Sequence, residues 1–461
     1  MTGQQEKVEE GMTKRSRTVT GQHENQEQRM MKRWKTLLLP LLAAFALVLA
    51  ACASTDTPEP EAPDEPAPAA TEAEEPAEPE EPAEPEEPVS TEPIKIGQLS
   101  DLTSTFTPWG LNVRDGMALA AQEINEMGGV GGRMIEILVQ DSQNDPDAAA
   151  TAWDRLVEDG VVAVGGVLSS GVAPTAASLA EADQIPVFFT KAGTPVSLTL
   201  DSRYTFRTCL PAAPMVAAPV LQYAQEQGLT KVGVIVADYA WGQGFKAAIE
   251  DTFEGSGIDY GEIQVAPVPP STDFTPFVRA LADAGAQMVI STGHPPGEAA
   301  ITALSADLIG DVPVTGAWAP PDRSVSLTDT AVGRFADFTC ADFFGDEYAE
   351  LARRYLAFSD NLFMSDDAVS GYAIVTMVAQ AVEAVGDDPV AIAEYMHANS
   401  FDMPGYAHPL SWTEWGELAE AQPIMYLINE GPAPEGLNNA GDWWLELLSQ
   451  TDPIEPYVPG S

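Results

Sequence analysis

From residue 94 onward, short apolar runs alternate with amphipathic segments. The apolar runs are rich in β-branched residues and have the length of buried strands: IKIGQLS, MIEILVQDS, VVAVGGV, IPVFFT, KVGVIVAD, QMVISTG and VPVTGAW. In the first amphipathic segment, apolar residues recur at spacings of three and four and predict one buried helix face: Val113, Met117, Ala120, Ile124 and Met127. Strands that alternate with helices predict parallel sheets with helices on both faces. Two such runs meet around 204–211, so we expect two α/β lobes.

Further helices are predicted by the same periodicity, in the segments DAAATAWDRLVEDG (closed by Gly160), VAPTAASLAEAD, GFKAAIEDTFEGSG and FTPFVRALADAG. After Cys340 the pattern becomes mostly helical, in EYAELARRYLAFS, SGYAIVTMVAQAVEAVG and PVAIAEYMHAN. The segment PLSWTEWGELAEAQPIMYLINEG that follows is hairpin-like.

The glycine-rich stretch NEMGGVGGR (125–133) has the composition of a phosphate-binding loop but not its context. A phosphate loop follows a strand and opens a helix. Here the glycines close a helix and precede a strand. Gly128 or Gly129 is therefore expected to be the left-handed residue after a helix C-terminus, and we give the nucleotide-binding alternative little weight.

Residues 30–52, MMKRWKTLLLPLLAAFALVLAAC, have the pattern of a lipoprotein signal peptide. A basic stretch precedes an apolar run from Leu37 to Ala51, which is short of the roughly 20 residues that a spanning helix needs. Small residues before Cys52 resemble the bacterial lipobox and imply a lipid anchor on the outer face of the cytoplasmic membrane, periplasmic or at the cell surface. The alternative is a buried cysteine in a short helix. Residues 1–29 are given no structure, and Met30 and Met31 are alternative starts.

Residues 53–93 contain 15 acidic residues, 11 prolines and no basic residue, which predicts an extended, disordered tether. The whole chain has 22 Lys+Arg against 70 Asp+Glu, a formal net charge of −48. Such a surface repels phosphates, which argues strongly against binding to nucleic acid or to an anionic membrane.

The segment EINEMGGVGGRMIEILVQDSQNDPDAA resembles the start of the leucine/isoleucine/valine-type periplasmic binding proteins. Further matches follow in family order: VGGVLSSG, FFTKAGTP, YTFRT, ADYAWGQG, DFTPFVRAL and PLSWTEWGEL. The resemblance spans roughly 94–430. It implies a two-lobed type I fold, with a parallel sheet flanked by helices in each lobe and three interlobe crossovers. Together with the lipobox, it implies the solute-binding lipoprotein of an ABC importer, with permease and ATPase partners, no cofactor and no enzymatic activity.

The expected boundaries follow from the leader, the tether and the resemblance. They are an uncertain upstream segment at 1–29, a signal peptide at 30–51, a lipidated cysteine and tether at 52–93, lobe 1 at 94–208 and 341–418, lobe 2 at 209–340 and 419–432, and a C-terminal extension at 433–461.

Ligands of open α/β sheets bind beyond the carboxyl ends of the strands. Ser169, Ser170 and Gly171 stand at such an end and open a helix, whose N-terminus favours an anion. The alternative is that one serine caps the helix, and both can hold at once. The resemblance implies that Ser169, Ala192 and Thr194 hold the carboxylate and part of the ammonium of an amino acid.

Trp109 and Trp241 match family aromatics in the first loop and in the "Tyr-Gly" turn of the second lobe. They are expected to wall the ligand's side-chain pocket from opposite lobes, and the alternative is ordinary lobe packing. The glycine that follows each tryptophan favours a surface turn at the cleft over a core position.

One family feature is missing. The acid that pairs with a ligand ammonium is replaced by Trp318 in GAWAPP, and the tyrosine expected after QMVISTG by His294. Asp322 and Asp101 are candidate substitutes. Because a buried ammonium without an acid costs several kcal/mol, the sequence favours a small carboxylate, with the amino-acid alternative left open. The deaminated analogue of the preferred ligand is then expected to bind within about tenfold of the amino acid.

Cys209 and Cys340 lie in YTFRTC and FADFTC, which resemble the first two interlobe crossovers. The resemblance implies a disulfide that clips the hinge, and the alternative is two buried thiols. No Cys/His cluster has metal-ligand spacing, so no metal is expected. Two other functions stay open: a ligand sensor without transport, and a serine hydrolase built on Ser169, although VLSSGV lacks the G-x-S-x-G spacing.

Overall fold

The computed structural model describes residues 91–268, 273–292, 297–316, 330–361, 363–430 and 443–460. The chain divides into two units, Met1–Pro85 and Glu86–Ser461, and the described residues belong to the second. The signal peptide, Cys52 and the tether as far as residue 90 lie outside the described residues.

The first lobe is built on a five-stranded sheet in the order β2-β1-β3-β4-β5, with every pairing parallel. Its strands are β1 (Ile94–Ser100), β2 (Ile135–Asp141), β3 (Ala163–Val167), β4 (Val187–Phe189) and β5 (Thr205–Arg207). Parallel pairing brings the carboxyl ends of β3 and β4 to one edge, because Val167 pairs with Phe189 at the end of the ladder. The loops after these two strands are therefore neighbours.

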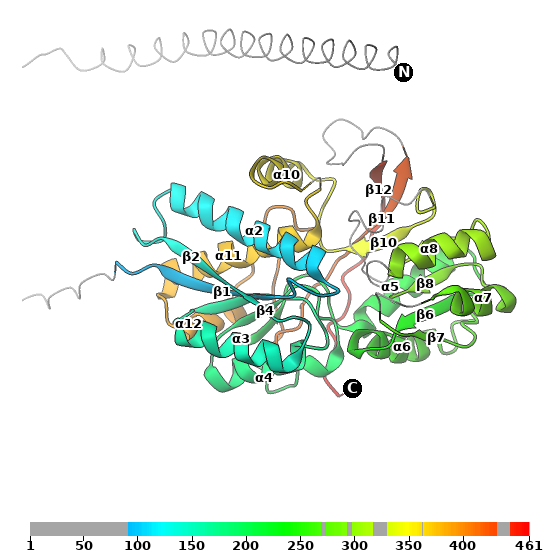
Figure 1. Cartoon of the computed structure of the whole chain (residues 1–461), viewed down its shortest axis with the longest axis horizontal. Helices are drawn as coiled ribbons and strands as arrows, with labels where there is room; N and C mark the ends of the chain where they lie inside the picture. The colour runs from blue at the N-terminus through cyan, green and yellow to red at the C-terminus, as the bar shows by residue number, and fades with distance from the viewer. Residues whose placement is uncertain are drawn as a thin grey trace, which may run out of the picture. The chain divides into compact units, whose positions relative to one another are not determined.

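Helices cover both faces of this sheet (Figure 1). One face carries α2 (Thr107–Glu126) and α11 (Asp366–Val385), and the other carries α3 (Pro146–Glu158) and α4 (Ala173–Asp183). At the centre of the first face, a Cβ on Gly116 of α2 would overlap the carbonyl oxygen of Ala368 on α11. The glycine thus lets two backbones meet, and it fixes the first turn of α11 beside α2.

The helix α11 is long and apolar enough to cross a membrane by length and composition alone. Its apolar residues are buried in the fold: Val369, Ile374, Val375, Met377 and Val378 are each 0% exposed. It is the core helix of lobe 1. Two more helices precede and follow it: α10 (Asp346–Phe358) and α12 (Pro389–Ala398).

The second lobe has a four-stranded parallel sheet in the order β7-β6-β8-β9. Its strands are β6 (Gly233–Ala237), β7 (Gln264–Ala266), β8 (Val289–Ser291) and β9 (Val314–Thr315). Its helices are α5 (Ala213–Glu226), α6 (Ala240–Phe253), α7 (Thr275–Ala284) and α8 (Gly297–Leu308). The pairs α5–α6 and α7–α8 pack together, so the expected α/β class holds in both lobes.

A third, antiparallel sheet joins segments far apart in the chain: β10 (Ala336–Thr339), β11 (Ile424–Glu430) and β12 (Trp443–Gln450). The chain passes between the lobes after β5, after β10 and before β11. The hairpin-like segment is only partly a hairpin: Trp412 and Leu418 form an antiparallel bridge, but β11 pairs with β10 and β12. The C-terminal extension is thus integrated, since it supplies β12.

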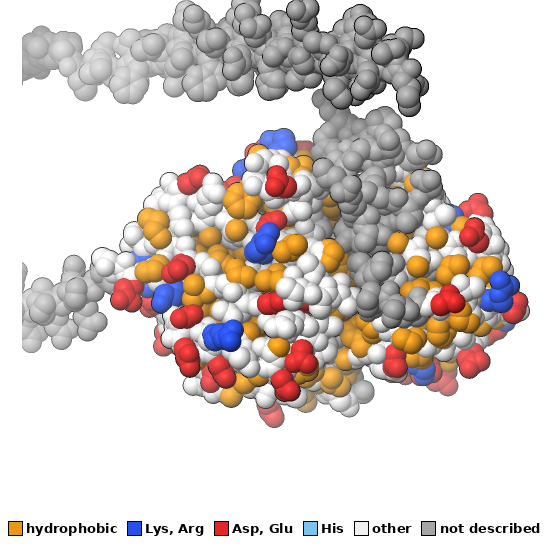
Figure 2. Space-filling model, in the orientation of Figure 1, with side chains coloured by type: hydrophobic (Ala, Val, Ile, Leu, Met, Phe, Trp, Pro, Cys, Tyr) orange, Lys and Arg blue, Asp and Glu red, His pale blue; other side chains and the backbone are white. Residues whose placement is uncertain are grey.

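The pattern also misplaced some details. Met127 is 79% exposed, because α2 ends at Glu126 and leaves this residue in the turn. The helices α5 and α8 were not predicted, and α5 contains Pro219 in its interior. Acidic side chains are spread over the visible surface, as the charge predicts (Figure 2).

The glycine-rich stretch is a structural turn. Gly128 and Gly129 have positive φ values of 106° and 74° directly after α2, and Gly129 donates from its amide to Ile124 O at 2.9 Å. The Asn125 side chain then bonds both the amide and the carbonyl of Ile135, at 2.7 and 2.9 Å, which attaches β2 to the end of the helix.

Candidate functional site

The residues expected to bind the ligand meet where β3 and β4 end. Ser169, Ser170, Ala192 and Thr194 are all at most 2% exposed. The Thr194 amide donates to the hydroxyl of Ser170 at 3.2 Å, so the two loops are directly bonded. The parallel register brings these residues together across 24 positions of sequence.

Ser169 stands in the turn before α4, whose N-cap residue is Val172 and makes no side-chain capping bond. Its hydroxyl accepts from the amide of Gly171 at 3.1 Å, and its carbonyl accepts from the amides of Val172 and Ala173. The hydroxyl donates in turn to Oδ1 of Asn144, at 2.5 Å. Asn144 was missed by the sequence interpretation, although it stands beside the matched Asp145 and has a left-handed φ of 53°. Neither serine is thus the N-cap residue of α4: the Ser169 hydroxyl accepts within the turn before the helix, and the Ser170 hydroxyl accepts from the neighbouring loop.

Trp109 and Trp241 stand in the first turns of α2 and α6, and each is 3% exposed. A Cβ on the following residue, Gly110 or Gly242, would overlap the carbonyl oxygen of Asp101 or Ala237, respectively. The prediction that the two tryptophans stand in surface turns is therefore wrong. Each glycine lets a helix begin in contact with the end of the preceding strand, and this contact buries the tryptophan.

The two lobes touch at this edge. The ring of Trp241, from lobe 2, packs so closely on Gly193 that a Cβ there would overlap it. The rings of Phe106 and Tyr239, one from each lobe, have centroids 6.1 Å apart. Burial raises the pKa of Tyr239 well above its ordinary value, so its hydroxyl is neutral. The loop after β4 is thus enclosed between lobes.

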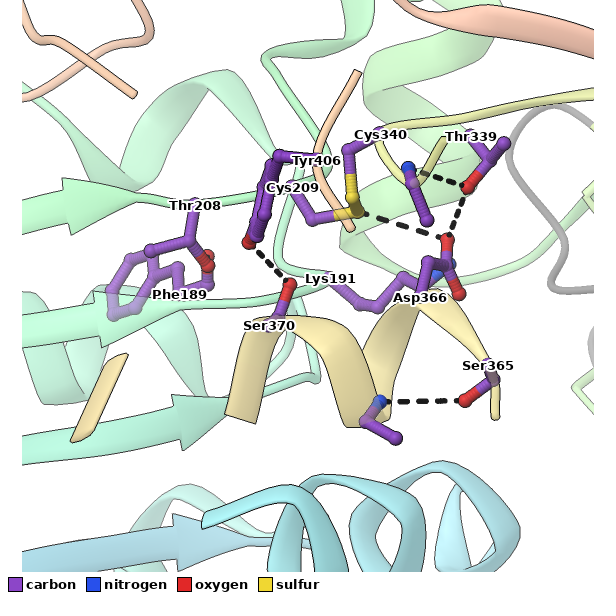
Figure 3. The surroundings of a disulfide bond; sticks show 12 residues. Phe189, Lys191, Thr208, Cys209, Thr339, Cys340, Ser365, Asp366, Ser370 and Tyr406 are labelled. Carbon is purple, nitrogen blue, oxygen red and sulfur yellow. Dashed lines mark hydrogen bonds and ion pairs between the residues drawn. A yellow bond between two sulfur atoms is a disulfide. The ribbon is translucent and has the colours of Figure 1, made fainter. Parts of the chain in front are cut away.

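Sequence interpretation missed a buried cation at the end of β4. Lys191, directly before Ala192, places its Nζ 2.7 Å from Oδ2 of Asp366 at the start of α11 (Figure 3). The same Nζ lies 6.0 Å from the ring centroid of Trp109. Burial lowers the pKa of Lys191, but the negative charges of Asp366, Asp367 and Asp337 outweigh burial and leave it raised. Lys191 is therefore charged at neutral pH.

A second buried ion pair supports the same loop from behind. The guanidinium of Arg207 donates to the carbonyl oxygens of Ala192 and Thr194, the latter at 2.7 Å, and its Nε lies 3.0 Å from Oε2 of Glu417. Both side chains of the pair are 0% exposed. Two carbonyls of the candidate ligand loop are thus already engaged by the protein.

Of the two candidate substitutes for the missing acid, Asp101 and Asp322, the structure describes only Asp101. Asp101 is 1% exposed, and its carboxylate accepts from the amides of Ser104 and Phe106 and from the Ser104 hydroxyl. It stabilises the turn before α2. His294, Trp318 and Asp322 lie outside the described residues.

A disulfide joins Cys209, just after β5, to Cys340, just after β10, across 131 residues (Figure 3). It connects the first two passages between the lobes. Oδ2 of Asp366 lies 3.7 Å from the Cys209 sulfur, and the three potential metal-ligand atoms of Cys209, Cys340 and Asp366 lie within 4.8 Å of one another. Since the two sulfurs are bonded to each other, they offer no thiolates to a metal.

The contacts of Ser169 do not support the serine hydrolase alternative. In the described part of the chain, the Ser169 hydroxyl bonds the Asn144 side chain and the Gly171 amide, and neither is a general base. Of the histidines in the described part of the chain, His397 bonds the carbonyl of Arg203 and His408 that of Pro409.

The sequence profile of a family described as "Periplasmic binding protein" matches residues 93–428. Among curated proteins, a leucine-, isoleucine-, valine-, threonine- and alanine-binding protein of Pseudomonas aeruginosa is 25% identical over 73% of this chain and 90% of its own length. A Leu/Ile/Val-binding protein of Escherichia coli is 24% identical over 71% of this chain and 88% of its own length.

Solved structures share the fold. A solute-binding protein of an ABC transporter from R. palustris, in complex with benzoate, aligns with a TM-score of 0.67 and 18% identity over 80% of this chain and 98% of its own. A leucine-binding protein from Thermotoga maritima aligns with a TM-score of 0.64 and 19% identity over 79% of this chain and 99% of its own.

Proposed function

The chain belongs to the periplasmic binding protein family, and on that premise we propose that it captures a small carboxylate between its lobes for an ABC importer. The carboxylate is a branched-chain or other apolar amino acid, or a related acid. The family is one of extracytoplasmic solute-binding proteins rather than enzymes. We keep the ligand sensor without transport as the second candidate, because capture of the ligand is the same in both.

One observation carries the proposal: the serine loop after β3 and the loop of Ala192 to Thr194 meet at one sheet edge, against Trp241 of the other lobe. Ligands of such sheets bind beyond the strand ends, and the N-terminus of α4 gives this edge a positive dipole that favours a carboxylate. The buried aromatic rings of Trp109 and Trp241 favour an apolar ligand body.

The relatives support a small carboxylate as the ligand, but they do not distinguish an amino acid from a simple acid. Those named above include proteins that bind leucine and its apolar neighbours, and one whose structure holds benzoate. A carboxylate is the group that these ligands share.

A thermal-shift screen of the full chain tests the proposal. Apolar amino acids, aromatic acids, aliphatic acids and amides are compared. A ligand at 100 times its Kd stabilises the folded state by about 2.7 kcal/mol. We expect carboxylates to stabilise the protein and the matching amides to fail.

Ser170→Ala removes the hydroxyl bonded to the Thr194 amide. We expect it to weaken binding of the ligand found in the screen by about tenfold, or 1.4 kcal/mol. Ser202→Ala is the control, because Ser202 is also buried but accepts from the Thr199 amide in another turn. If amides stabilise the protein as well as their acids do, the carboxylate site is refuted. Labelling of Ser169 by a fluorophosphonate would instead support the hydrolase.

We also propose that the mature protein begins at a lipidated Cys52. The support is the basic stretch, the short apolar run and the small residues before this cysteine. Wild-type protein then partitions into detergent, and Cys52→Ala gives soluble or unprocessed protein. A mature form that retains residues 1–51 contradicts the anchor.

A further inference from the structure

The hydroxyl of Ser169 has its single hydrogen engaged within the protein. Its oxygen lies 2.5 Å from Oδ1 of Asn144 and accepts from the Gly171 amide at 3.1 Å. A separation of 2.5 Å is typical of an O–H donor and short for an N–H donor, so the Ser169 hydroxyl donates to the carbonyl oxygen of Asn144. A ligand carboxylate only accepts hydrogen bonds. While this bond lasts, Ser169 therefore cannot donate to the carboxylate.

The side-chain amide of Asn144 carries two N–H groups at the same place. Ser169 holds the carbonyl arm of the amide, and this bond orients the other arm, Nδ2. Within the described part of the chain, Nδ2 has no hydrogen-bond acceptor, and the residue is partly exposed. The Ser170 hydroxyl accepts from the Thr194 amide at 3.2 Å and keeps its own hydrogen. The Asn144 amide and the Ser170 hydroxyl are thus donors available to a carboxylate at this edge.

The backbone also fixes Asn144 at the edge of the sheet. Asn144 follows β2, and β1 lies between β2 and β3, so its bond to Ser169 crosses the end of β1. The amide of the preceding residue, Gln143, donates to the carboxylate of Asp141 at 2.9 Å. Both Gln143 and Asn144 have a left-handed φ of 53°, which asparagine adopts more readily than most residues. The Asn144 side chain is therefore held both by its turn and by Ser169.

We propose that Asn144 is a ligand-binding residue whose Nδ2 donates to the carboxylate of the ligand, and that Ser169 is the positioning residue that orients its amide. The inference rests on the proposed function and adds a specificity-determining residue to the same site. The resemblance implies that Ser169 itself holds the carboxylate, whereas here its hydrogen goes to Asn144. Because Ser169 holds the carbonyl arm, the amide cannot turn that oxygen to a ligand N–H group without losing this bond.

Two substitutions remove the donor in different ways. Glycine adopts a φ of 53° without strain, so Asn144→Gly removes the side chain and leaves the turn intact. Asn144→Asp keeps an acceptor for the Ser169 hydroxyl but replaces the N–H groups by a negatively charged oxygen. We expect Asn144→Gly to raise the Kd of a bound acid about tenfold. We expect Asn144→Asp to raise it about a hundredfold or more, because two carboxylates repel each other.

Calorimetry on the full chain tests both variants with 3-phenylpropionate and 3-phenylpropanamide, and with leucine and leucinamide. We expect each primary amide to bind Asn144→Asp no more weakly than it binds the wild type, because its own N–H group can donate to the new carboxylate. The preference for the acid is then lost. A residue that only holds Ser169 in place would not give this pattern, since aspartate still accepts from the Ser169 hydroxyl.

The matched controls are Gln143→Gly and Gln143→Glu. Gln143 adjoins Asn144, has the same φ and carries an exposed side chain. Gln143→Gly tests the flexibility that a glycine adds to this turn, and Gln143→Glu tests a negative charge one residue away. We expect both to leave the Kd of the acid within about threefold. Equal losses in Gln143→Glu and Asn144→Asp would indicate a general effect of charge and would refute the contact.

The outcomes distinguish this inference from the proposed function. If neither leucine nor 3-phenylpropionate binds the wild-type chain, the capture of apolar carboxylates fails and the role of Asn144 fails with it. If an acid binds the wild type and both Asn144 variants within about threefold, the proposed function stands and the role of Asn144 is refuted. If Asn144→Gly loses the acid but Asn144→Asp keeps it, Asn144 only positions Ser169, which also refutes the proposed contact.

Discussion

At the scale of single residues, buried ion pairs hold the candidate ligand loop in place. Arg207 bonds two carbonyls of this loop and the hydroxyl of Ser197, and Glu417 neutralises it. Burial lowers the pKa of Arg207 and raises that of Glu417, which is the cost of removing both charges from water. Mutual attraction and the carbonyl acceptors offset this cost.

Glu417→Gln is expected to destabilise the protein by about 3–5 kcal/mol, because it leaves the guanidinium of Arg207 buried without a counter-charge. Unfolding in urea measures the change in the free energy of unfolding. The control is Glu250→Gln, which breaks the exposed pair with Lys246 and is expected to cost less than about 1 kcal/mol. Similar costs for the two variants would show that the Arg207 pair is not needed.

The site was partly predictable at this scale. Ser170 and Thr194 could be found because both follow apolar runs, and parallel strands carry such residues to one edge. Lys191 and Asp366 could not be paired, because 175 residues separate them and hydrophobic periodicity says nothing of which helix start meets which strand end. The pairing of Arg207 with Glu417 was likewise not predictable, since Arg207 lies within β5 and Glu417 is 210 residues further along the chain.

At the scale of elements, short apolar runs identified most strands of the two parallel sheets, since buried parallel strands have no polar alternation to obscure them. The strands β5 and β7 were not predicted. The crossing of α2 and α11 was not predictable. It depends on Gly116 and Gly371, each of which would place a Cβ against the backbone of the other helix. A glycine within an amphipathic sequence pattern does not indicate which other helix will pack against it.

Gly116→Ala tests this crossing by the sign of its effect. In a helix with free space, the change stabilises by about 1 kcal/mol through helix propensity. Here the new methyl would overlap the Ala368 carbonyl, so we expect a loss of about 1–3 kcal/mol in the free energy of unfolding. A gain in stability would show that the helices do not approach this closely.

At the scale of the whole molecule, the passages between the lobes are held together in two ways. The strands β10 and β11 pair directly, and the disulfide joins the segments after β5 and β10. The family resemblance could place both cysteines near the hinge, but the added strand β12 came from a segment that was predicted only as a C-terminal extension.

The disulfide between Cys209 and Cys340 closes a long loop, with a sequence separation of 131. Cross-linking such a loop restricts the unfolded chain, and loop-closure entropy sets the stabilisation at up to about 5 kcal/mol. The double variant Cys209→Ala/Cys340→Ala is therefore expected to unfold at lower denaturant with a near-native fold, because β10 and β11 still pair. Unfolded, unreduced wild-type protein should leave both cysteines unalkylated, and reduction should expose both. Quantitative alkylation without reductant would contradict the bridge and restore the alternative of two separate buried thiols.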